Sequence, residues 1–152
     1  MEDRVEKELQ ELIGLNKEID ELYHSIATSL GFSDSALDVL YALYSLGDGC
    51  SQAQICRQCY SSRQTINSSI AKMTREGLLY LEQGQGRQRR ICLTEEGRRL
   101  VREKIHPVAK MERAAFMELD GEERGQLIRL TKKFADSLQR QAGILIAAEG
   151  RT

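Results

Sequence analysis

Residues 62–77 carry side chains suited to hydrogen bonding rather than to catalysis. Hydroxyl, amide and guanidinium groups alternate here with Ile66, Ile70 and Met73. In a helix, at roughly 100° per residue, the three apolar residues fall on one side and the polar groups on the other. A solvated helix usually carries Glu and Lys pairs, and it stays as the alternative interpretation. Amide and hydroxyl groups beside arginine instead suit contact with base edges in the major groove of DNA.

The helix has clear boundaries, and its polar residues divide by expected role. Ser62 is a good N-cap and Gly77 a good C-terminal stop. We expect Arg63, Gln64, Asn67 and Ser68 to contact base edges, and Ser51, Thr65 and Arg75 to contact phosphates.

The next segment predicts a β-hairpin with a positively charged tip. Residues 78–82 are apolar enough for a strand, residues 84–86 suit a turn, and residues 89–94 suit the returning strand. Arginines at such a tip can enter the minor groove or bind phosphates. The tip arginines are Arg87, Arg89 and Arg90.

A short helix before residue 62 completes the pattern. Ser51 and Gln54 form a capping-box sequence, and the helix that they open should end near Cys59, three residues before Ser62. Two helices joined by so tight a turn are a helix-turn-helix, and the hairpin makes it a winged one.

These residues resemble the multiple antibiotic resistance regulator (MarR) family. The resemblance rests on residues 62–70, 76–79 and 86–97 and spans residues 4–145, and its most specific part is the wing leading into Leu-Thr-x-x-Gly. It implies a dimeric winged-helix transcription factor that binds a pseudo-palindromic DNA site and responds to a small ligand or to oxidation. It also implies that Arg87 is the wing arginine of the family's Asp-x-Arg motif, although Gln85 stands at the aspartate position.

The distribution of charge agrees with a nucleic-acid partner. The chain has 152 residues and a formal net charge of −1. Residues 57–104 hold 11 Lys and Arg against 5 Asp and Glu, whereas residues 1–56 hold 3 against 11. Positive charge is thus concentrated in the segment that would face phosphates, and this local balance matters more for DNA binding than the net charge.

The terminal segments predict long amphipathic helices. Apolar residues alternate by three and four from Val5 to Leu30, and further apolar positions follow Thr94 and Asp120, with a kink expected at Pro107. These helices carry more apolar surface than one small domain can cover, so we expect them to pack against a second copy. The predicted fold is mainly α with a small β-hairpin wing: a dimerisation helix at 1–31, a winged helix-turn-helix at 32–97 and C-terminal dimerisation helices at 98–152.

Four cysteines raise the question of metal or redox chemistry. Cys56 and Cys59 form a lone Cys-x-x-Cys, which supplies half of a tetrahedral zinc site, so we interpret them as packing residues. Cys50 is the candidate for a reactive thiol, because it should lie in a loop that opens a helix. Family members that sense organic peroxides use a cysteine near the start of the first helix, and this chain has none there.

Aromatic residues could line an effector cleft of the kind that the family resemblance implies. The candidates are Tyr23, Tyr41 and Tyr44, for which core packing is the alternative role. His24 and His106 suit polar packing better than metal binding.

Catalysis is not expected. The chain has two histidines, no local signature of a catalytic triad and no glycine-rich phosphate loop. We expect no cofactor, no metal and no membrane segment, and a cytoplasmic location. The predicted function is a DNA-binding transcriptional regulator, a ligand-responsive repressor. A thiol-based redox regulator and a winged-helix adaptor that binds proteins remain alternatives.

Overall fold

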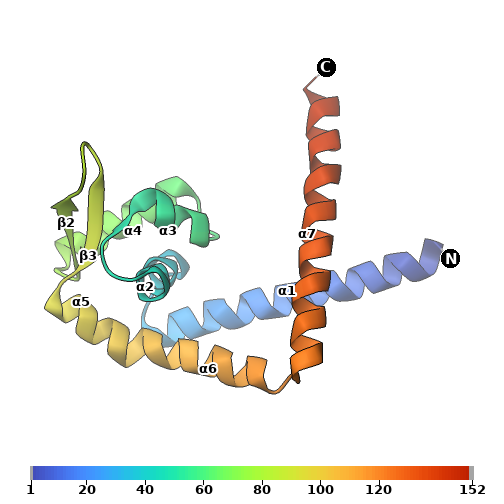
Figure 1. Cartoon of the computed structure of the whole chain (residues 1–152), viewed down its shortest axis with the longest axis horizontal. Coiled ribbons are helices and arrows are strands. Elements are labelled where there is room, and N and C mark those ends of the chain that lie inside the picture. Colours follow the sequence, from blue (N-terminus) through green and yellow to red (C-terminus); the bar gives the residue numbers. More distant parts are fainter. Residues whose placement is uncertain (1, 151–152) are drawn as a thin grey trace. The chain divides into compact units, whose positions relative to one another are not determined.

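The computed structural model describes residues 2–150. It is mainly helical, with one small antiparallel sheet, as the sequence predicts (Figure 1). The elements are α1 (Glu2–Leu30), α2 (Asp34–Leu46), β1 (Cys50–Ser51), α3 (Gln52–Gln58), α4 (Arg63–Arg75), β2 (Leu79–Gln83), β3 (Arg89–Leu93), α5 (Glu95–Leu100), the π-helix η1 (Val101–Ile105), α6 (His106–Met117) and α7 (Gly121–Glu149).

The helix-turn-helix forms where the capping residues predict it. The Ser51 hydroxyl accepts the Gln54 amide at 3.2 Å, and the Gln54 side chain accepts the Ser51 amide at 2.8 Å. This capping box satisfies amide groups that the first turn of α3 leaves without partners. Ile55 of α3 and Ile66 of α4 are fully buried in one core with α2, so the two helices are held by apolar packing as well as by their caps.

The wing is the outer part of a three-stranded sheet in the order β1-β3-β2. Leu79 pairs with Leu93 and Gln83 with Arg89, which gives the predicted hairpin. Cys50 pairs with Ile91 on the other side of β3. The strand β1 was not predicted, because it has two residues and its partner lies about 40 positions along the chain.

The motif Thr94-x-x-Gly97 joins the wing to α5. The Thr94 hydroxyl donates to the Gly77 carbonyl at 2.6 Å, and its oxygen accepts the Gly97 amide at 3.0 Å. A Cβ on Gly97 would lie 2.1 Å from the Leu78 carbonyl oxygen. Glycine is therefore required for α5 to approach the segment before β2.

Pro107 is accommodated by a π-helical turn. The His106 amide donates to the Val101 carbonyl, five residues back, and η1 ends immediately before α6. Such a turn widens the helix locally, where the proline ring would otherwise meet the carbonyl four residues earlier. The sequence predicted a kink at this proline, and the structure has a π-helical turn before it that continues directly into α6.

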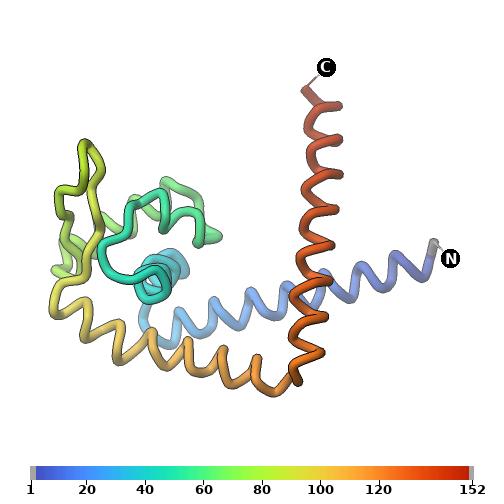
Figure 2. Tube along the Cα trace, in the orientation of Figure 1, coloured from blue at the N-terminus to red at the C-terminus, as the bar shows by residue number. Residues whose placement is uncertain are grey.

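The two long terminal helices leave most of their apolar side chains exposed. The chain divides into two compact units, residues 1–108 and 109–152. In the first unit, α1 buries only Ala27. In the second, α7 runs as one continuous helix (Figure 2) and has no buried residue. Its predicted capping box is present, with Asp120 accepting the Glu123 amide at 2.9 Å.

Membrane insertion of a helix finds no support in the described residues. None of their helices combines the length and the apolar character that a membrane span needs.

Candidate nucleic-acid interface

The polar side of α4 is exposed over its whole length. Ile66, Ile70 and Met73 are buried, as predicted. Six polar residues of the helix lie in solvent, namely Arg63, Gln64, Thr65, Asn67, Ser68 and Arg75. The helix therefore presents hydrogen-bonding groups on an open face while its apolar face anchors it.

Side-chain hydrogen bonds fix both the start and the middle of α4. The Ser62 hydroxyl accepts the Thr65 amide at 3.2 Å, which confirms the predicted N-cap. The Ser61 hydroxyl donates to the Asp38 carboxylate of α2 at 3.1 Å, while burial raises the pKa of that carboxyl. The Ser35 and Ser69 hydroxyls lie 2.6 Å apart and join α2 to α4. These contacts hold the exposed face in a defined position.

The wing tip is closed by backbone and amide contacts. The Gln83 side-chain amide donates to the Gly86 carbonyl at 2.8 Å, and the Gly84 amide donates to the Gln88 carbonyl at 2.8 Å. Gly86 has a φ of +67°, a conformation that favours glycine. The tip is thus shaped by Gln83 and Gly86 without the aspartate that Gln85 replaces.

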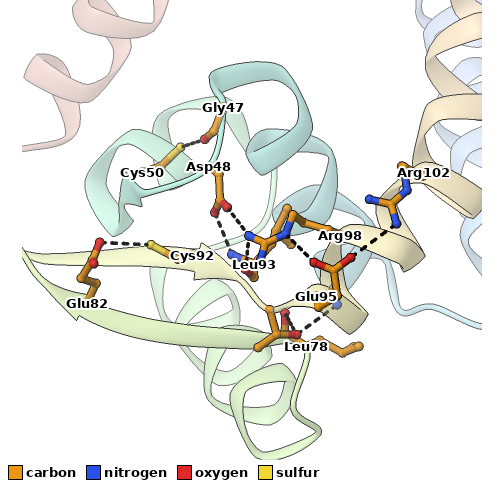
Figure 3. A network of polar contacts seen from close by, with 12 residues as sticks. Gly47, Asp48, Cys50, Leu78, Glu82, Cys92, Leu93, Glu95, Arg98 and Arg102 are labelled. Carbon is orange, nitrogen blue, oxygen red and sulfur yellow. Dashed lines mark hydrogen bonds and ion pairs between the residues drawn. The ribbon is translucent and has the colours of Figure 1, made fainter.

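The base of the wing is anchored by Asp48 (Figure 3). One oxygen of its carboxylate accepts the Leu93 amide at 2.7 Å, and the other pairs with the Arg98 guanidinium at 3.1 Å. Arg98 also donates to the Leu93 carbonyl at 2.9 Å and to Glu95 at 3.3 Å. These contacts tie β3 and α5 to the loop before β1, so the hairpin has a fixed root.

The arginines fall into two groups by their contacts. Those of α5 and η1 are ion-paired: Arg98 with Asp48, Arg99 with Glu96 and Arg102 with Glu95. On the helix-turn-helix and the wing, five arginine side chains have no hydrogen-bond or ion-pair partner within residues 2–150. They are Arg57, Arg63, Arg75, Arg87 and Arg89, which leaves these guanidinium groups available for an anionic partner.

Arg90, also predicted to contact DNA, has a structural contact. Its Nε donates to the Gly49 carbonyl at 2.8 Å, so part of its guanidinium holds β3 to the loop before β1. The side chain is otherwise exposed.

An open hollow of about 780 Å³ lies between α3 and the wing tip. No acidic residue lines it, and its polar lining includes Ser51, Gln54, Arg57, Gln88, Arg89 and Arg90. Sequence reasoning missed Arg57 and Gln54 as candidate contacts. The positive balance of residues 57–104 was the available signal, but it could not show which arginines converge.

The candidate effector residues are partly brought together. The rings of Tyr41 and Tyr44 lie 6.0 Å apart, and the Tyr44 hydroxyl lies 3.1 Å from Nδ1 of His106. Tyr23 lies on α1, with 37% of its surface exposed. His24 lies 2.9 Å from the Asp34 carboxylate, which agrees with a polar packing role.

Cys50, Cys59 and Cys92 are set in surroundings that disfavour ionisation of their thiols. Cys50 lies in β1 and is buried, so its predicted place in a loop is wrong, and its pKa is raised by burial and by the nearby Asp48. Burial also raises the pKa of Cys92, and it raises that of Cys59 to about 12. Cys56 and Cys59 pack against the core. Among residues 2–150, no three His, Cys, Asp or Glu side chains gather so as to hold a metal ion.

A comparison with sequence families matches residues 30–91 to the MarR family. This range covers α2 to α4 and most of the wing. None of the curated proteins matches the chain closely enough to indicate a relative.

Solved structures of MarR-type regulators have the same fold. A MarR family regulator from Neisseria meningitidis is 18% identical, over 88% of this chain and 96% of its own, with a TM-score of 0.71. MepR of S. aureus, in a complex with DNA, is 22% identical over 84% and 93%, with a TM-score of 0.68. Bordetella bronchiseptica BpsR, whose DNA binding is regulated by 6-hydroxynicotinic acid, is 21% identical over 82% and 98%, with a TM-score of 0.62.

Proposed function

We propose that this chain, whose winged-helix region belongs to the MarR family, is a homodimeric transcription regulator that binds a pseudo-palindromic DNA site. The observation that carries the proposal is the exposed face of α4 together with the wing. Caps and core packing hold these elements in place, and hydroxyl, amide and unpaired guanidinium groups are exposed on them. The MarR family is one of transcription regulators, which also argues against an enzyme.

Each exposed residue has a role in this proposal. Arg63, Gln64, Asn67 and Ser68 contact base edges in the major groove, and Ser51, Ser62, Thr65 and Arg75 lie near phosphates. Arg87 of the wing occupies the neighbouring minor groove, where the negative potential is strongest, and Arg89 lies beside it at the backbone edge of that groove. Arg90 supports them by holding β3 to Gly49.

A second copy of the chain is the occupant that we propose for the terminal helices. Val5 is 60% exposed and Ile19 53% exposed on α1, and Leu130 and Leu138 are 50% and 54% exposed on α7. Covering apolar surface contributes roughly 25 cal/mol per Å², and so many exposed apolar side chains are unusual in a monomer. A twofold dimer then presents its two copies of α4 about one turn of DNA apart, which requires a pseudo-palindromic site.

Regulation by a small molecule is part of the proposal. BpsR, which has the same fold, has its DNA binding regulated by 6-hydroxynicotinic acid. The dimer could adopt forms that differ in the spacing of their two α4 helices. A ligand of this chain would act by binding one of these forms more tightly than another, since only differential affinity shifts such an equilibrium. Repression of transcription is the expected consequence of occupying an operator. The tyrosines near His106 are the candidate contacts for the ligand.

A redox regulator is the weaker candidate. The thiolate is the reactive form of cysteine, and the pKa values of Cys50, Cys59 and Cys92 are all raised.

Selection of bound sequences from random double-stranded DNA tests the proposal. We expect enrichment of an inverted repeat whose half-sites lie about 10 base pairs apart, and an affinity that falls steeply with salt. A scrambled duplex of the same length is the control. Enrichment of no sequence, with binding that is insensitive to salt, would contradict the proposal.

A further inference from the structure

The hollow between α3 and the wing has the chemistry of an anion site. Arg57 and Arg89 line it and have no partner within the described part of the chain. Guanidinium groups only donate hydrogen bonds, and no carboxylate lines the hollow to neutralise them. A ligand with several acceptor oxygens and negative charge is therefore the complement of this lining.

Two uncharged side chains that line the hollow, those of Ser51 and Gln54, also offer hydrogen-bond donors to a ligand. The Gln54 carbonyl oxygen accepts the Ser51 amide at 2.8 Å, so the remaining polar group of that side chain is its NH₂. The Ser51 oxygen accepts the Gln54 amide at 3.2 Å, and its hydroxyl proton stays uncommitted. The capping box thus uses the acceptors of both residues and leaves their donors at the edge of the hollow.

The position of the hollow indicates where the anion comes from. If α4 lies in the major groove and the wing in the adjacent minor groove, the sugar-phosphate strand that separates these grooves must pass between the two elements. In the sequence α3 comes directly before α4, and Arg57 of α3 lines the hollow together with Arg89 of the wing.

We propose that this hollow is a seat for a backbone phosphodiester of the strand between the two grooves, with Arg57 of α3 and Arg89 of the wing as its charged contacts. The inference rests on the proposed DNA-binding function and adds Arg57 and Gln54 to its interface. It also gives α3 a direct part in DNA binding beyond supporting α4.

Arg57→Gln tests the seat through the salt dependence of DNA binding. Each phosphate contact contributes about 0.9 to the slope of log affinity against log salt. The variant should reduce the slope by about that amount and weaken binding roughly eightfold at 0.1 M salt, with little effect near 1 M. Arg57→Lys should restore the slope because it keeps the charge. Arg129→Gln, on α7, is the matched control and should leave the slope unchanged.

A scan of neutral linkages locates the contact. Duplexes that each carry one methylphosphonate in place of one phosphate are titrated with the wild-type chain and with Arg57→Gln. We expect one linkage, on the strand between the groove contacts, to weaken binding by the wild type and to have no effect on the variant. Equal sensitivity of both proteins at every linkage, with an unchanged salt slope, would overturn the seat while leaving DNA binding intact.

Two further outcomes separate this inference from its premise. Failure of the wild-type chain to bind any duplex would overturn both the proposed function and the seat. The second outcome is that inorganic phosphate displaces DNA from the wild type but not from Arg57→Gln, and more strongly than chloride does at equal ionic strength. If no linkage in the scan is sensitive as well, this result would assign the hollow to a free anion and overturn the backbone assignment.

Discussion

The contacts of individual arginines separate those that build the fold from those that can bind a partner. Arg98 spans Asp48, Leu93 and Glu95 at the root of the wing, so its charge is already neutralised inside the molecule. Arg87 lies exposed at the wing tip and has no such partner in the described chain. The same residue type therefore serves two purposes, and only the neighbouring carboxylates distinguish them.

Arg87→Ala should weaken DNA binding by roughly 1 to 3 kcal/mol if the guanidinium makes a well-formed contact in the groove. The fold should be unaffected, because the exposed Arg87 side chain has no hydrogen-bond or ion-pair partner within residues 2–150. Fluorescence anisotropy of a labelled operator measures the affinity, with Arg113→Ala on α6 as the control. Equal affinities of wild type and Arg87→Ala would exclude the wing arginine from the interface.

The thiols of Cys50, Cys59 and Cys92 should react slowly at neutral pH. Burial raises the pKa of Cys50 and Cys92, and that of Cys59 to about 12, so the thiolate fraction at pH 8 lies below that of a free cysteine. We expect mass-resolved alkylation to modify these three positions more slowly than in the chain unfolded by guanidinium chloride. Faster labelling of any of them in the folded chain would revive the redox interpretation.

The raised pKa of Cys59 also predicts how stability depends on pH. Above the ordinary thiol pKa of about 8.5 the unfolded chain ionises at this position while the folded chain keeps its proton. The stabilisation is therefore complete below that pH and is lost as the pH rises towards about 12. Denaturant unfolding of wild type and Cys59→Ala at increasing pH should show the smaller alkaline loss in the variant.

At the scale of elements, the joint between the wing and α5 explains the Leu-Thr-x-x-Gly motif. Thr94 caps α5 and binds the carbonyl of Gly77, while Gly97 leaves room for the carbonyl of Leu78. One short motif thus ends β3, begins α5 and holds both against the end of α4. The orientation of the wing relative to α4 depends on this joint.

Gly97→Ala should destabilise the fold by about 1 to 3 kcal/mol, because the new methyl group would displace a backbone carbonyl in a packed region. Gly125→Ala is the matched control, since Gly125 lies in α7 with open space around its Cβ position. That change should be neutral or stabilise by up to about 1 kcal/mol. Denaturant unfolding compares them, and equal stabilities of the two variants would contradict the packing argument.

At the scale of the whole molecule, the main feature is the apolar surface that α1 and α7 leave exposed. Each helix has 29 residues, and among those whose burial the structure describes the two helices bury one, Ala27. Helices in proteins gain most of their stability from packing an apolar face, whereas isolated helices are marginal in water. We therefore relate the stability of these helices to the proposed dimer and not to the single chain.

Ile19→Asp should shift the chain to a monomer and reduce its affinity for an inverted repeat, because the carboxylate would lose its hydration in the proposed interface. Gln10→Asp is the control: nine residues away, it adds the same charge on the opposite side of α1. Sedimentation velocity measures the oligomeric state. A wild-type chain that is monomeric at every concentration, or an Ile19→Asp dimer as strong as that of the control, would argue against this interface.

Much of this fold could be predicted because its signals are local. Ser62 caps α4 through a group three residues away, Gly77 takes a positive φ after it, and the spacing of Ile66 and Ile70 sets its buried side. Caps and helical periodicity depend on a few neighbouring residues. The sequence alone therefore determined the bounds of α4, its exposed face and the hairpin that follows.

The features that the sequence could not determine all join distant segments. The pairing of Cys50 with Ile91 creates β1 and buries a thiol expected in a loop, and the partner of Asp48 is the amide of Leu93. The hollow that brings Arg57 near Arg89 likewise exists only once α3 and the wing are packed side by side. Such contacts depend on how elements far apart in the chain pack against one another, and no local pattern of residue types predicts that packing.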